Sequence, residues 1–198
     1  RVREICLLSA QGFVHESRIR AVDFLRSSGK SDCAGLVAEC LRGDLKRELA
    51  FIELPRDYIR LASAWQDTPE IREACGTPDP DLRAALGRGF MLMGKGAEAA
   101  AVLEPLLENR AMGEHGLYAL SCCYNEALHG KDWKKLLHIA DCVAAWPLPE
   151  GISSHLAYSS AIAYQALGNS VRALSVWRTV CEDETAAAWQ RAYASWYL

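Results

Sequence analysis

Three consecutive residues, Gly29, Lys30 and Ser31, match the end of a phosphate-binding loop, which would hold the phosphates of a nucleotide. That loop needs another glycine five residues before Gly29, because its main-chain N–H groups must wrap closely around the phosphates. Phe24 stands at that position instead. The sequence therefore predicts no nucleotide cofactor at this segment.

The histidines and cysteines lack the spacing of a metal site. His15 and Glu16 begin like a zinc-binding His-Glu-x-x-His helix, but Ile19 replaces the second histidine. No Cys-x-x-Cys pair occurs, and the spacing also does not fit a secreted disulfide framework. The eight cysteines are Cys6, Cys33, Cys40, Cys75, Cys122, Cys123, Cys142 and Cys181. We expect small buried thiols in a protein of the cytoplasm or another reducing intracellular compartment.

Nucleophile motifs are also missing, since no Gly-x-Ser-x-Gly segment occurs in the chain. We therefore expect that the protein is not an enzyme and uses neither a metal ion nor an organic cofactor. Its net charge of −3 comes without a long basic run, so no nucleic-acid partner is predicted. No apolar run approaches the ~20 residues that cross a bilayer, and no signal peptide is visible. Because the chain begins at Arg1, we expect it to be part of a longer protein.

Helical spacing dominates the elements that would carry any site. Apolar residues recur at intervals of three and four, as in Leu82, Leu86, Phe90 and Met93. Strand-type alternation is nearly absent. Glycine and proline fall between the apolar runs and cut the 198 residues into helices of roughly ten to fifteen residues. The predicted fold class is all-α.

Two distant segments share one pattern, which indicates an internal repeat. "FMLMGKGAEAAAVL" (90–103) and "YQALGNSVRALSVW" (164–177) have a ring, a glycine, an alanine and a large apolar residue at the same offsets. Between them, Tyr124 is taken as the ring of a middle unit, 34 residues after Phe90 and 40 before Tyr164. Left-handed glycines at 94 and 168 would end the first helix of two units.

Three short motifs carry a family resemblance. "LGRGF" (86–90), "LSCCY" (120–124) and "SAIAY" (160–164) resemble the first helix of the tetratricopeptide repeat, a helix–turn–helix of 34 residues. The small residues Gly87, Ser121 and Ala161 would let neighbouring helices approach closely. The resemblance implies a right-handed superhelix, or α-solenoid, of antiparallel helix pairs.

The same resemblance divides the chain into three parts. Residues 1–79 form a less regular helical region with one degenerate repeat near 15–47. Residues 80–185 contain about three repeats, and residues 186–198 form a capping helix or the start of a further repeat. Because an uncapped repeat end exposes apolar surface, the C-terminal edge could also form a homo-oligomer.

The resemblance further implies a concave groove lined by the first helix of each pair, which would bind a peptide or a helical segment of another protein. Arg88 would anchor an acidic group, and Tyr118 and Tyr158 would supply amphipathic contact area. The predicted partner-binding residues are Arg88, Met91, His115, Tyr118, Asn125, His155, Tyr158 and Gln165. The predicted function is that of an adaptor or scaffold. The alternatives are a secretion-type chaperone that holds a client protein and a structural, oligomerising subunit of a larger assembly.

Overall fold

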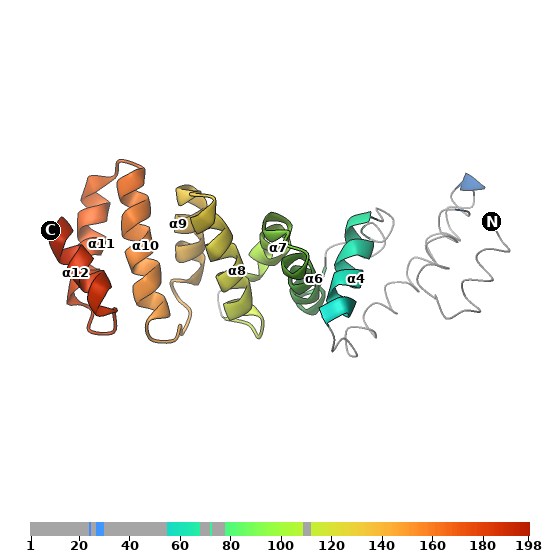
Figure 1. Ribbon diagram of the computed structural model, residues 1–198, viewed down its shortest axis with the longest axis horizontal. Coiled ribbons are helices and arrows are strands. Elements are labelled where there is room, and N and C mark those ends of the chain that lie inside the picture. Colours follow the sequence, from blue (N-terminus) through green and yellow to red (C-terminus); the bar gives the residue numbers. More distant parts are fainter. Residues whose placement is uncertain (1–23, 25–26, 30–54, 68–71, 73–77, 109–111) are drawn as a thin grey trace. The chain divides into compact units, whose positions relative to one another are not determined.

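The computed structural model describes residues 24, 27–29, 55–67, 72, 78–108 and 112–198. Within these ranges the chain forms eight α-helices and one 3-10 helix, with no strand, which confirms the all-α prediction (Figure 1). The proposed degenerate repeat near 15–47 lies almost wholly outside the described residues. The contacts divide the chain into two compact units, Arg1–Val102 and Leu103–Leu198, which we describe separately. The domain limits at 79 and 185 stay predictions.

Unit 1 contains α4 (Pro55–Asp67), α6 (Pro80–Leu92) and most of α7 (Gly96–Leu103). Proline occupies the first position of both α4 and α6, where its missing N–H costs no hydrogen bond. Asp79 caps α6, since its carboxylate accepts a hydrogen bond from the main-chain N–H of Leu82. The core of unit 1 brings the three helices together through Ala62, Leu82, Leu86, Phe90 and Ala99.

Helices α4 and α6 approach each other closely at Gly89, two residues after Gly87, the small residue of the 86–90 motif. A Cβ added to Gly89 would lie 2.6 Å from the Cβ of Ala62 and would overlap the main-chain carbonyl of Tyr58. Only a residue without a side chain fits there. Gly89 therefore sets the distance between the two helices.

Unit 2 contains the 3-10 helix η1 (Glu104–Leu106) and the five helices α8 (Gly116–His129), α9 (Trp133–Val143), α10 (Ile152–Ala166), α11 (Ser170–Glu182) and α12 (Ala188–Tyr197). Each helix from α9 onward packs against the one before it (Figure 1). An ion pair of 2.9 Å between Lys135 and Glu104 links η1 to α9. The helices of unit 2 are therefore packed in chain order.

Helices α9 and α11 contribute large apolar side chains to the core of unit 2. Leu136, Ile139 and Val143 of α9 are fully buried. In α11, Ala173, Trp177 and Val180 pack against Ala161 of α10 and Ala194 of α12. The alanine and the large apolar residue of the repeated pattern, Ala173 and Trp177, are thus buried in this core, and the matching alanine of the earlier segment, Ala99, is buried in unit 1.

Three helices end in the same way, at positions 94, 131 and 168, which are spaced by 37 residues. At each end the residue after the C-cap is left-handed, with φ of 71° at Gly94, 54° at Lys131 and 75° at Gly168. The next N–H bonds back five residues, from Lys95 to Phe90, from Asp132 to Ala127 and from Asn169 to Tyr164. This is the Schellman motif, and it confirms the helix ends that the sequence predicted at Gly94, after α6, and at Gly168, after α10.

The middle copy of this ending corrects the sequence alignment. In α8 the residue that corresponds to Phe90 and Tyr164 is Ala127, so Tyr124 lies nearly one turn earlier in its helix than the other two rings. The left-handed residue there is Lys131 and not a glycine, while the preceding Gly130 is right-handed.

None of the described helices is both long and apolar enough to cross a membrane.

Candidate functional site

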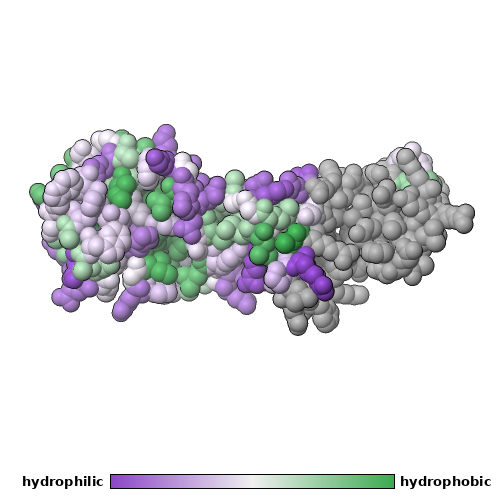
Figure 2. All heavy atoms as spheres, viewed as in Figure 1, coloured by the Kyte–Doolittle hydropathy of each residue, from purple (hydrophilic) through white to green (hydrophobic). Residues whose placement is uncertain are grey.

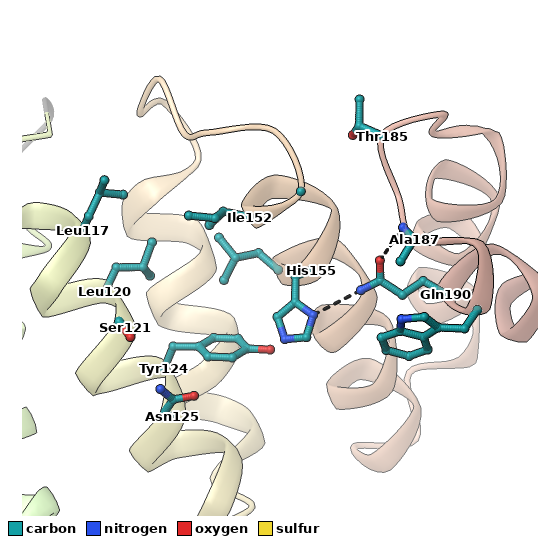
Figure 3. A pocket seen from close by; sticks show the side chains of 13 residues that line it. Leu117, Leu120, Ser121, Tyr124, Asn125, Ile152, His155, Thr185, Ala187 and Gln190 are labelled. Carbon is teal, nitrogen blue, oxygen red and sulfur yellow. Dashed lines mark hydrogen bonds between the residues drawn. The ribbon is translucent and has the colours of Figure 1, made fainter.

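A cavity of about 570 Å³ opens in unit 2 between α8, α10 and α12 (Figure 3). Helices α8 and α10 each pack against the helix that follows, α9 and α11, and α12 is the last helix that the structure describes. The side chains around the cavity come from the first half of α10, the middle of α8 and the start of α12. They are Leu117, Leu120, Ser121, Tyr124, Asn125, Gly151, Ile152, His155, Leu156, Thr185, Ala187, Trp189 and Gln190.

Apolar side chains form most of the wall. Leu117 and Leu120 come from α8, Ile152 and Leu156 from α10, and the indole of Trp189 from α12. Trp189 is 57% exposed, and Ile152 is 36% exposed, so both offer apolar surface to a ligand. A concave apolar wall of this size is typical of a ligand-binding pocket.

A few polar groups interrupt the apolar wall. Ser121 and Asn125 are exposed on α8 and face the cavity, and neither has a hydrogen-bond partner among the described side chains. The Asn125 amide can both donate and accept. Because no Asp, Glu, Lys or Arg side chain lines the cavity, the site suits a neutral ligand better than an acidic one.

One polar link ties α8 to α10 at the base of the cavity. The hydroxyl of Ser159 donates to the main-chain carbonyl of His155 at 2.9 Å. The buried Tyr124 hydroxyl also contacts the Ser159 oxygen and therefore acts as the donor in that bond. Burial raises the pKa of Tyr124 above its usual range. The link keeps the two helices in fixed register.

A second polar link ties α10 to α12. The side-chain amide of Gln190 lies 3.1 Å from Nδ1 of His155, and its oxygen accepts from the main-chain N–H of Ala187 at 3.0 Å. Figure 3 shows Gln190 between these two partners, with Tyr124 and Asn125 on the opposite wall. His155 is therefore held from the α12 side through its Nδ1, while its main-chain carbonyl accepts from Ser159 of its own helix, which in turn contacts Tyr124 of α8.

The third link anchors the loop between α11 and α12. Ser154, which is buried, donates to the Asp183 carboxylate at 2.5 Å, and Thr185 donates to it from both its hydroxyl and its N–H. The bond from Ser154, followed by those from Thr185, lowers the pKa of Asp183. This loop carries Thr185 and Ala187 to the edge of the cavity.

Of the eight predicted partner-binding residues, the structure brings two, Asn125 and His155, to this cavity. Tyr158 lies nearby but packs half-buried among aromatic rings of α11 and α12. Gln165 is exposed near the end of α10 and does not line the cavity. His115 immediately precedes α8, and Tyr118 of α8 bonds to the Cys122 thiol one turn later.

The other two predicted residues belong to unit 1. Arg88 is engaged by Tyr58 of α4, since its guanidinium donates to the phenol oxygen at 3.1 Å and lies 5.6 Å from the ring centroid. Met91 is 44% exposed on α6. The role of Arg88 as an anchor for an acidic partner stays a prediction, and any such partner would compete with Tyr58.

Sequence reasoning missed Leu117, Ser121 and Gln190 at the cavity. Ser121 was assigned to close helix packing, yet it faces solvent. With the helix ends aligned, Ser121 corresponds to Tyr158, and Tyr118 corresponds to His155. The predicted binding positions on α8 were derived by aligning Tyr124 with Phe90. The helix ends align Ala127 with Phe90 instead, so those positions are three residues too early in the chain.

The cysteine thiols near this site are poor nucleophiles. Cys122 and Cys123 are buried in α8, as expected, and burial raises the pKa of Cys123 to about 12. Cys142 and Cys181 are half-buried free thiols. In the part of the chain that the structure describes, no three His, Cys, Asp or Glu side chains gather as metal ligands would.

Comparisons of the chain with protein-family models, with curated proteins and with solved structures gave no match. The class that fold and site define is therefore an all-α protein of sequentially packed helices, with a cavity between α8, α10 and α12 that no Asp, Glu, Lys or Arg side chain lines.

Proposed function

We propose that the protein is a protein-binding module of tetratricopeptide type, in which unit 2 presents the cavity between α8, α10 and α12 to a segment of another protein. The helix endings at 94, 131 and 168 support a repeated helix pair. The packing of the helices in chain order is what an α-solenoid requires. The function would be that of an adaptor or scaffold.

The observation that carries this proposal is the cavity itself. It combines about 570 Å³ of space, an apolar wall that includes an exposed tryptophan, and polar groups with open hydrogen-bonding capacity. Interface centres are depleted of charge and enriched in aromatic residues, as this wall is. A peptide segment with neutral, apolar side chains fits this chemistry.

The proposal is tested with random peptides displayed on phage and selected against the purified protein. Selected peptides should bind the wild type, and Ile152→Asp should weaken them at least about tenfold, because it places a charge in the apolar wall. Leu174→Asp is the matched control, since Leu174 is a similarly exposed apolar residue of α11 outside the cavity. Failure to select any peptide, or equal binding by both variants, would contradict the proposal.

A second candidate function, assembly through the C-terminal helix, has its own support. Trp196 is 76% exposed, and Trp189 and Tyr193 form a stripe with it along α12. In Figure 2, the C-terminal helices show pale spheres among green and purple ones, and Trp and Tyr fall in this pale range together with Gly, Ser and Thr. An exposed aromatic stripe of this kind marks an interaction surface.

Sedimentation velocity at rising protein concentration tests this second candidate. The wild type should form a dimer that Trp196→Ser dissociates, whereas Val171→Ser, at an exposed apolar residue of α11, should leave the dimer intact. A wild type that stays monomeric up to about 100 μM would exclude a dimer of ordinary affinity.

A further inference from the structure

The capping interaction at the start of α12 fixes the orientation of the Gln190 amide. Its oxygen must face the main-chain N–H of Ala187, 3.0 Å away, because the opposite orientation would bring two donors together. The amide nitrogen of Gln190 therefore points at His155 and can only donate. Since Gln190 is only 3% exposed, water has little access to replace either bond.

This donor determines which nitrogen of His155 carries the proton. Nδ1 lies 3.1 Å from the amide nitrogen and must accept its hydrogen, so Nδ1 holds a lone pair. The neutral ring then has its proton on Nε2. The tautomer is thus set by a hydrogen bond that begins at the main chain of α12.

The Nε2–H group of His155 is open to a ligand. His155 is exposed and lines the cavity, and no side chain or carbonyl in the described ranges accepts a hydrogen bond from Nε2. Figure 3 shows its ring between the Gln190 amide and the wall formed by Tyr124 and Asn125.

We propose that Gln190 is a positioning residue that holds His155 as a hydrogen-bond donor, so that the cavity selects a neutral hydrogen-bond acceptor next to a branched apolar group. In a protein partner this is a main-chain carbonyl of an extended segment beside a Leu- or Ile-type side chain. A helix would not satisfy it, because the carbonyls in a helix interior are already bonded within the helix. This inference rests on the proposed peptide-binding function.

A carboxylate would also accept from Nε2, but the cavity disfavours it. No lysine or arginine lines it, so no permanent positive charge compensates the loss of hydration of an anion. The site is therefore distinct in chemistry from one that recognises an acidic chain end.

The substitution Gln190→Glu tests the proposal without disrupting the helix start. The new carboxylate can still accept from the Ala187 N–H, and glutamate is a favoured residue at this capping position. Its second oxygen cannot donate to His155 and would instead require a proton on Nδ1. We expect ¹⁵N NMR of the imidazole, recorded at about pH 9, to show the proton on Nε2 in the wild type and on Nδ1 in the variant.

Two small probes of the same shape report on selectivity at that pH. The ketone 4-methyl-2-pentanone only accepts hydrogen bonds, whereas 2-amino-4-methylpentane is largely an ammonium ion and only donates. The wild type should bind the ketone at least about tenfold more tightly, as measured by shifts of the cavity resonances. Gln190→Glu should abolish or reverse this preference, and His155→Phe should abolish it while keeping an apolar ring.

The outcomes separate this inference from the proposed function. A wild-type His155 with its proton on Nδ1, or equal binding of the two probes, overturns the inference even if selected peptides bind at the cavity. Failure of the peptide selection, with the tautomer and probe preference as expected, overturns the peptide-binding function and leaves a small neutral acceptor as the ligand class.

Discussion

The ring of Tyr158 meets the indole of Trp189 edge to face, with the ring centroids 5.0 Å apart. Tyr158 also contacts Trp177 at 5.3 Å and Tyr193 at 5.7 Å, so it joins α10 to both α11 and α12. Trp189 is in turn part of the cavity wall. Tyr158 therefore acts on the cavity through the position of Trp189, and its own ring is largely occupied by neighbours.

Tyr158→Ala should destabilise the protein by about 2–3 kcal/mol, because it removes three aromatic contacts from a half-buried site. Tyr158→Phe keeps the ring and should cost less than about 0.5 kcal/mol. Urea unfolding followed by circular dichroism measures both. An alanine variant with the wild-type midpoint would show that Tyr158 is free of the cluster.

Gly89→Ala should destabilise unit 1 by about 2 kcal/mol or more, since the added methyl group would overlap the main chain of Tyr58. The control is Gly113→Ala, where an added Cβ meets no atom within 4 Å. Hydrogen exchange of α4 and α6 amides localises the effect. If both variants unfold at the same denaturant concentration, the close approach of α4 and α6 is wrong.

The parts of the fold that were predictable from sequence depend on neighbouring residues along one helix. Apolar spacing indicated α6 and α10, and the glycines at 94 and 168 marked where these helices end. Ala99 and Trp177, which stand at the offsets that the two segments share, are both buried. These features need only a helix period and a glycine that can adopt positive φ.

The unpredicted parts depend on contacts between distant residues or on a strained conformation. α8 ends with Lys131 at positive φ, which no residue preference indicates, so its register was taken from Tyr124 and was wrong by three residues. The bond from Gln190 to His155 joins residues 35 apart, and glutamine alone gives no signal for it. The sequence therefore pointed to only two of the residues that line the cavity, Asn125 and His155.

Substitutions at the left-handed residues that follow α8 and α10 should change the stability of the protein in opposite directions. Lys131→Gly should stabilise the protein by about 0.5–1 kcal/mol, because glycine relieves the left-handed strain at φ 54° more than it adds chain entropy. Gly168→Ala should cost about 1 kcal/mol for the converse reason, at φ 75°. Thermal unfolding of the two variants in one buffer checks the prediction. Changes of the same sign would contradict the common geometry.

The Asp183 carboxylate should make stability depend on pH in the acid range. Its pKa is lowered in the folded state by the hydrogen bond from Ser154 and by those from Thr185. A group with a depressed pKa stabilises the fold above its unfolded value, which is near 3.8, and loses this contribution as the pH falls through the folded value. We expect the urea midpoint to decrease as the pH is lowered from about 5 to about 2.

Ser154→Ala identifies the donor responsible for this acid dependence. It removes one charge-assisted hydrogen bond and should cost about 1 kcal/mol at pH 7, with a smaller cost at pH 2, where the carboxyl is protonated. Ser153→Ala is the matched control, because Ser153 is the exposed neighbouring serine of the same helix. A Ser154→Ala variant with the full wild-type difference between pH 7 and pH 2 would show that Thr185 alone lowers the pKa of Asp183.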